Sequence, residues 1–71
     1  MIKFENKENG RFYYMQLQKD LFDELVICII RGGRNVSVSR LVFCHDSLCA
    51  KKEIERLSRV RLQRGYTLIN D

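Results

Sequence analysis

The most constraining feature of the sequence is the apolar run Leu25–Ile30, which leads directly into Arg31-Gly32-Gly33-Arg34. An uninterrupted apolar run rich in β-branched residues predicts a central strand rather than a half-exposed one. Glycine lets a ligand approach the backbone closely, and arginine offers a planar fork of donors suited to phosphate. The end of this strand is therefore a candidate anion site. The alternative is a tight hairpin turn whose arginines are simply solvated.

Strand and turn patterns account for the chain before this run. Ile2–Glu5 alternates and predicts a short edge strand, and Asn6–Gly10 ends in the Asn-Gly pair favoured by hairpin turns. Arg11–Gln18 has a period of two, which predicts a second strand. The residues on its expected core side are Tyr13, Met15 and Leu17.

A further hairpin is expected after residue 18. Lys19–Glu24 mixes acids with apolar residues and predicts a wide turn before the central strand. Gly32–Asn35 predicts the next turn. Val36–Phe43 alternates valine with serine before a continuous apolar stretch, which predicts a strand with a bulge near Arg40.

The C-terminal third has the pattern of one amphipathic helix and one closing strand. Asp46 or Ser47 is the expected N-cap, and Gly65 the expected stop. The apolar stripe facing the sheet comprises Ala50, Ile54 and Leu57, with Arg61 on the same stripe. Tyr66–Ile69 predicts the closing strand. The sequence therefore predicts a single α+β domain over residues 1–71, a small antiparallel β-sheet with one α-helix packed across it.

Charge is distributed unevenly along the 71 residues, whose net charge is +4. Residues 31–64 contain nine Lys/Arg and three Asp/Glu, so most of the excess lies in the second half. An excess of this kind favours a polyanionic partner such as DNA or another nucleic acid.

Three cysteines, Cys28, Cys44 and Cys49, form no Cys-x-x-Cys motif, which predicts reduced thiols in a cytoplasmic protein. No stretch is apolar for long enough to span a membrane. Cys44, His45 and Cys49 have the wrong number and spacing for zinc, so we expect no metal and no cofactor. No nucleophile–base set or nucleotide loop is present, and we expect no enzymatic activity.

The remaining signal is a set of arginines. Arg31, Arg34 and Arg40 lie on or beside the predicted turn, and Arg61 and Arg64 lie at the helix end. Arg61 faces the sheet, where the terminal helix carbonyls can hold it or where it can reach over the sheet toward the glycine pair. The three tyrosines likewise have two interpretations: their rings stack on bases, or they pack in the core. They are Tyr13, Tyr14 and Tyr66.

The order of these segments resembles the WGR domain, which is named for a Trp-Gly-Arg tripeptide at a strand end. Gly33 and Arg34 stand at the glycine and arginine of the tripeptide, and Gly65 and Tyr66 match the family's closing Gly-Tyr pair. The resemblance extends from about residue 4 to residue 69. Gly32 stands where the family has its tryptophan.

The resemblance implies a small antiparallel sheet with a helix across it and, in line with DNA-dependent poly(ADP-ribose) polymerases that contain the domain, nucleic-acid binding. Without the tryptophan, stacking worth about 1–3 kcal/mol per contact is absent. Reintroducing tryptophan at Gly32 is expected to strengthen binding to DNA ends.

Two functions follow from the sequence. The first is a non-catalytic module that contacts phosphates in a sequence-tolerant way. Its expected site residues are Arg31, Gly32, Gly33, Arg34, Arg40, Arg61 and Arg64. The second is a protein-interaction or assembly module, in which the apolar second face of Leu25–Ile30 contacts a protein partner or a second copy in a homodimer.

Overall fold

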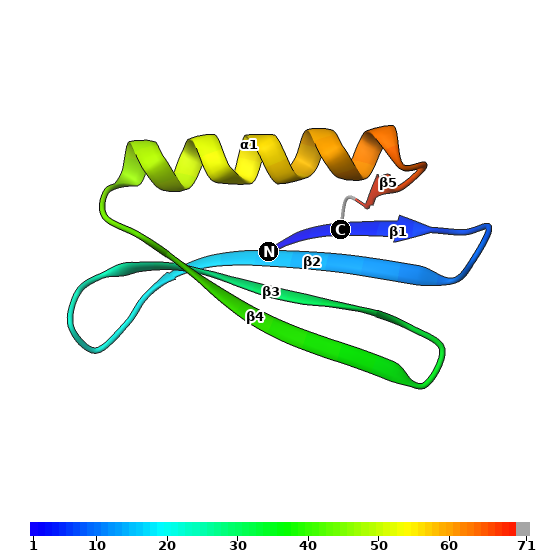
Figure 1. Cartoon of the computed structure of the whole chain (residues 1–71), viewed down its shortest axis with the longest axis horizontal. Helices are drawn as coiled ribbons and strands as arrows, with labels where there is room; N and C mark the ends of the chain where they lie inside the picture. The colour runs from blue at the N-terminus through cyan, green and yellow to red at the C-terminus, as the bar shows by residue number, and fades with distance from the viewer. Residues whose placement is uncertain (70–71) are drawn as a thin grey trace.

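The computed structural model describes residues 1–69 and has the element order ββββαβ. The elements are β1 (Ile2–Asn6), β2 (Arg11–Lys19), β3 (Leu25–Gly33), β4 (Val36–Cys44), α1 (Ser47–Gln63) and β5 (Thr67–Ile69). The strands form one antiparallel sheet in the order β4-β3-β2-β1-β5, and α1 lies across one face of it (Figure 1). The predicted α+β architecture is confirmed.

The core lies between α1 and the sheet. Its strand residues alternate in sequence because successive side chains point to opposite faces, and its helix residues come from the predicted apolar stripe. The buried members are Phe4, Tyr13, Met15, Ile27, Ile29, Cys44, Ala50 and Leu57. Leu17, predicted for this core, is instead 44% exposed. The reason is that β1 begins at Ile2, opposite Met15, so no strand among the described residues flanks Leu17 on that side.

Three local predictions are wrong. The strand β1 is not an edge strand, because β5 pairs with its free side through Phe4 and Leu68. The turn after β3 contains only residues 34 and 35, because Gly32 and Gly33 continue the pairing with β4. The turn is closed by Asn35, which has a φ of 61°.

The third wrong prediction is the bulge near Arg40. Pairing between β3 and β4 is unbroken, and Arg40 lies directly opposite Ile29. Val42 faces α1 and packs against the core, whereas Leu41 and Phe43 lie on the other face of the sheet. The apolar run is continuous because both faces of β4 carry apolar side chains here.

We call that other side of strands β2, β3 and β4 the open face, because α1 lies on the opposite side of the sheet (Figure 1). Its residues are Phe12, Tyr14, Gln16, Gln18, Val26, Cys28, Ile30, Gly32, Ser37, Ser39, Leu41 and Phe43. None of them is charged. Leu41 and Phe43 are more than half exposed, whereas Val26 is buried. In the part of the chain that the structure describes, no helix has the length and hydropathy needed to cross a membrane.

Candidate functional site

The two hairpin turns β1–β2 and β3–β4 lie at the same end of the molecule as the C-terminal end of α1 (Figure 1). A hollow of about 650 Å³ is found at this end. Five of the chain's eight arginines line it, and its thirteen described lining residues include no aspartate or glutamate. We call it the basic hollow; its arginines are Arg11, Arg31, Arg34, Arg61 and Arg64.

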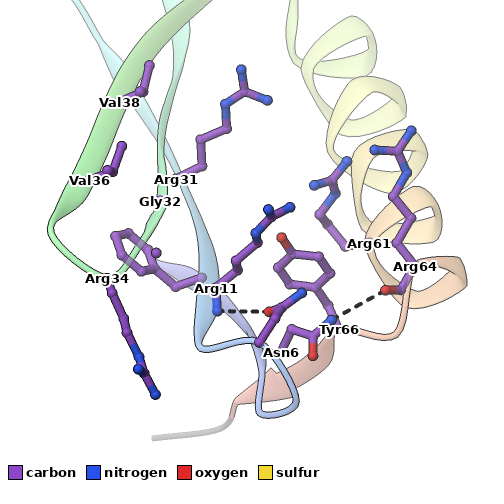
Figure 2. Close-up of a pocket in the computed structure, with 13 residues that line it drawn as sticks. Asn6, Arg11, Arg31, Gly32, Arg34, Val36, Val38, Arg61, Arg64 and Tyr66 are labelled. Atoms are coloured by element: carbon purple, nitrogen blue, oxygen red, sulfur yellow. Dashed lines mark hydrogen bonds between the residues drawn. The ribbon is translucent and has the colours of Figure 1, made fainter.

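Strand register places two of these arginines on the helix side of the sheet. Arg31 lies opposite Tyr13, and Arg11 opposite Asn6. Because side chains alternate along β2, Arg11 and Tyr13 occupy the same face. The guanidinium groups of Arg11 and Arg61 converge in Figure 2, whereas Arg34 points away from the centre of the hollow.

The end of α1 positions the other side of the basic hollow. The backbone N–H of Tyr66 donates to the carbonyl of Arg61 at 3.0 Å, and that of Gly65 donates to Leu62 at 3.2 Å. This pair of bonds, with Gly65 at a φ of 86°, is a Schellman motif. The reversal brings the Tyr66 ring back over the last helical turn, where it contacts the guanidinium of Arg61.

Arg61 is held by two aromatic rings. Its guanidinium carbon lies 4.4 Å from the centroid of the Tyr13 ring and 5.2 Å from that of Tyr66. Its Nε atom is buried and has no hydrogen-bond partner among the described residues. Cation–π contacts of this kind contribute about 0.5–2 kcal/mol, depending on desolvation. The Arg61 side chain is thus fixed by tyrosine rings while it lines the basic hollow.

Asn6 ties the end of β1 to the end of α1. Its side chain is buried, its amide nitrogen donates to the carbonyl of Arg64 at 3.5 Å, and its amide oxygen accepts from the backbone N–H of Glu8 at 3.0 Å. The backbone contact with Arg64 is drawn in Figure 2. These bonds fix the position of the β1–β2 turn relative to the C-terminal end of α1, and the two segments form opposite sides of the basic hollow.

Of the seven site residues predicted from sequence, six line the basic hollow and Arg40 does not. Arg40 lies in the middle of β4, opposite Ile29. The pKa of Glu53 is lowered chiefly by its hydrogen bond with Arg56, and the charges of Arg56 and Arg40 lower it further, against the effect of burial. Arg40 is thus placed beside an acidic group rather than among the arginines of the basic hollow.

The two glycines at this site differ in their surroundings. A Cβ atom on Gly32 would lie 2.0 Å from the backbone oxygen of Val36, whereas a Cβ on Gly33 would only meet the Arg11 side chain at 3.5 Å. Backbone atoms have no room to yield at 2.0 Å, so position 32 requires glycine for the close approach of β3 and β4. A tryptophan at position 32 therefore requires the backbone of this hairpin to move, and the gain in DNA binding expected from Gly32→Trp depends on that movement.

The cysteine–histidine cluster lies away from the basic hollow. Burial, followed by the proximity of Cys49, raises the pKa of the Cys44 thiol, which keeps it protonated and a poor nucleophile. The His45 side chain is exposed and lies 3.5 Å from a carboxylate oxygen of Asp46, the N-cap of α1. Within residues 1–69, no group of three or more His, Cys, Asp or Glu side chains is placed to hold a metal ion.

Arg11 and Asn6 are site residues that the sequence reasoning missed. The period of two that places Tyr13 on the core side also places Arg11 on that face, so the signal for Arg11 was present in the sequence. The position of Asn6 depends on the long-range pairing of β1 with β2 and on the helix end, which no local pattern reveals.

Comparison with protein-family models, with curated proteins and with solved structures finds no match for this chain.

Proposed function

We propose that this chain is a non-catalytic nucleic-acid-binding module of the cytoplasm that contacts phosphates through the basic hollow. The observation that carries the proposal is that five arginines, from both hairpins and the helix end, line one hollow whose described lining residues include no acidic side chain. Like charges gathered in this way repel one another unless an anion is bound, and the guanidinium fork is suited to phosphate oxygens.

Two features support a polyanion rather than a single small anion. The basic hollow is wide relative to one phosphate group, and its arginines come from several separate segments of the chain. The resemblance of Gly33, Arg34, Gly65 and Tyr66 to WGR signature positions favours the same function. Because arginines that contact phosphates carry no sequence information, binding is expected to tolerate changes of base sequence.

The proposal is tested by NMR titration of the labelled protein with blunt duplex, nicked duplex and single-stranded DNA, each at low and moderate salt. Residues of the basic hollow are expected to shift, with a dissociation constant of about 10⁻⁴–10⁻⁶ M near physiological salt. Affinity should fall steeply as salt increases because bound counterions are released. If no resonance shifts even at low salt, this function is excluded.

Two double variants, each removing two positive charges, distinguish binding at the basic hollow from a general effect of net charge. Arg31→Gln with Arg64→Gln removes two exposed charges of the hollow. Lys52→Gln with Arg59→Gln removes two exposed charges from the outer face of α1, outside the hollow. The first pair should reduce affinity for all sequences and flatten the salt dependence, while the second should have a much smaller effect. Equal effects would indicate nonspecific attraction to the whole molecule.

The second candidate function is protein interaction or assembly through the open face. The observation that favours it is the exposure of apolar side chains on a face that bears no charge, with Leu41 at 56% and Phe43 at 61%. Apolar surface of this kind marks interaction sites when it is contiguous. Replacing both residues with serine is expected to abolish any partner binding through this face without altering the basic hollow.

A further inference from the structure

The strand β4 forms one edge of the sheet, and among the described strands it pairs with β3 alone. Its pairing is regular over nine residues, from Gly33 opposite Val36 to Leu25 opposite Cys44. Alternate backbone N–H and C=O groups of β4 therefore point away from β3, and no other described strand pairs with them. A row of free backbone groups of this length is a template for another strand.

This edge lacks the features that usually prevent strand addition. Proteins commonly protect edges with proline, a bulge, several charges or a short strand. The chain contains no proline, the β4 register has no bulge, and Arg40 is the one charged residue of the strand. The opposite edge, β5, has three residues, Thr67–Ile69, in the part of the chain that the structure describes. The same sheet thus has one short edge and one long, regular edge.

The side chains along β4 suit a neighbouring strand. Val36, Val38, Leu41 and Phe43 are between 49% and 61% exposed, and Ser37 and Ser39 lie between them in sequence. Branched and aromatic side chains stabilise cross-strand pairs, each by about 0.2–1 kcal/mol. The edge therefore offers side-chain contacts as well as backbone groups.

We propose that the occupant of this edge is β4 of a second copy, paired antiparallel so that the two sheets become one continuous sheet. A twofold axis normal to the sheet places open-face residues opposite open-face residues and helix-face residues opposite helix-face residues. With the axis at Ser39, Arg40 lies opposite Val38 of the second copy, so the two arginines do not face each other. The protein has a net charge of +4, but β4 carries a single charge. Pairing through this strand therefore brings few like charges of the two copies close together.

The pairing places both helices on one side of the joined sheet, and with them both basic hollows. Val36 and Val38 line the basic hollow at the turn end of β4, so the antiparallel arrangement sets the two hollows at opposite ends of the joint. The pairing itself does not depend on nucleic-acid binding, and it is measured without nucleic acid. Its failure therefore leaves the proposed function untouched.

The first experiment is sedimentation velocity of the whole chain from about 10 μM to about 1 mM, the range suited to a small and weak interface. The mass is expected to rise with concentration from 8.5 kDa toward twice that value. Amide hydrogen exchange on the same samples should show protection that increases with concentration at alternate residues of β4 and not in β5. A protein that stays monomeric at the highest concentration overturns the proposal.

Two variants with the same added charge locate the interface. Ser39→Lys places a lysine at the centre of the exposed edge, and we expect it to weaken association by about tenfold or more. Gln16→Lys places a lysine on the open face of β2, an interior strand, and should change association by less than about twofold. Equal weakening by both variants would assign the contact to the open face and overturn edge pairing. The exchange pattern of the unmodified protein gives the same discrimination if either variant folds poorly.

Discussion

The guanidinium carbon of Arg61 lies 4.4 Å from the centroid of the Tyr13 ring, so a cation of the last helical turn packs on an aromatic ring of the second strand. Tyr13 is buried, and a ring fixed by core packing restricts the arginine that lies on it. The contact thereby connects the hydrophobic core to the basic hollow. It also explains how an arginine can occupy the sheet-facing stripe of α1.

A double-mutant cycle between Arg61 and Tyr13 should reveal this coupling. With Arg61→Gln and Tyr13→Leu, urea denaturation is expected to give a coupling free energy of about 0.5–2 kcal/mol. Repeating the cycle with Tyr13→Phe, which keeps an aromatic ring, should preserve most of the coupling. A coupling near zero with the leucine variant would show that the ring does not stabilise the cation.

A single-charge comparison tests the position of the binding surface. Arg11→Gln and Arg40→Gln each remove one exposed positive charge, but only Arg11 lines the basic hollow. If the proposed function holds, Arg11→Gln reduces the salt slope of DNA binding by about 1, and Arg40→Gln changes it less. Fluorescence anisotropy across a salt series measures both slopes. A larger effect at Arg40 would move the contact surface onto β4.

The sequence predicted the element order and limited the helix N-cap to Asp46 or Ser47, of which Asp46 takes this position, because both features depend on local patterns. The period of two set the faces of β2, and the helical stripe from Ala50 to Leu57 set the buried side of α1. The errors concern partners far along the chain. Nothing local in Ile2–Asn6 reveals that β5 covers its free side, and nothing in Leu17 reveals where β1 begins.

In the candidate site, too, local sequence patterns identified some residues, whereas features that depend on distant contacts were missed. Arg31, Arg34 and Arg64 were identified by charge and by their neighbours in sequence, and they do line one hollow. Arg40 does not line this hollow, because the unbroken register places it in the middle of β4, away from the turn. The need for glycine at position 32 comes from the close approach of the Val36 carbonyl, a contact across the hairpin that composition does not encode.

The helix–sheet core gives a prediction of stability. Leu57 is 6% exposed in the core, whereas Leu62 on the same helix is 57% exposed. Leu57→Ala is expected to cost about 2–5 kcal/mol of unfolding free energy, because it removes apolar contacts and leaves a cavity. Leu62→Ala should change it by less than about 0.5 kcal/mol. Thermal and urea unfolding measure both, and an unchanged midpoint for Leu57→Ala would contradict the observed packing.

The Glu53–Arg56 pair predicts a pH dependence. The hydrogen bond from Arg56 lowers the pKa of Glu53 below its ordinary value of 4.5. A carboxyl with a lowered folded-state pKa contributes stability that is present above the unfolded pKa and is lost as pH falls through the folded pKa. Because Arg56 is exposed and solvent screens the pair, this contribution is small.

NMR titration of the Glu53 carboxyl should therefore give a pKa below that of an unpaired glutamate. In Arg56→Gln the pKa should move back upward, since both the hydrogen bond and the positive charge are lost. At neutral pH, Glu53→Gln should lower the unfolding free energy slightly, and this difference should vanish below the folded pKa. A Glu53 pKa that Arg56→Gln leaves unchanged would show that the pair does not persist in solution.

The adjacent glycines of β3 provide the sharpest structural test. At Gly32 a methyl group would collide with the backbone oxygen of Val36, so Gly32→Ala forces the β3–β4 hairpin apart and should cost about 1–3 kcal/mol. At Gly33 the methyl group finds ordinary contact distance to the Arg11 side chain, and the residue has no positive φ. Gly33→Ala should therefore be neutral or slightly stabilising, by up to about 1 kcal/mol, because alanine restricts the unfolded chain. Urea denaturation of the two variants compares positions one residue apart with identical changes in composition. Equal stabilities would mean that the hairpin relaxes around residue 32, and tryptophan at that position would then become a feasible way to test the WGR resemblance by DNA binding.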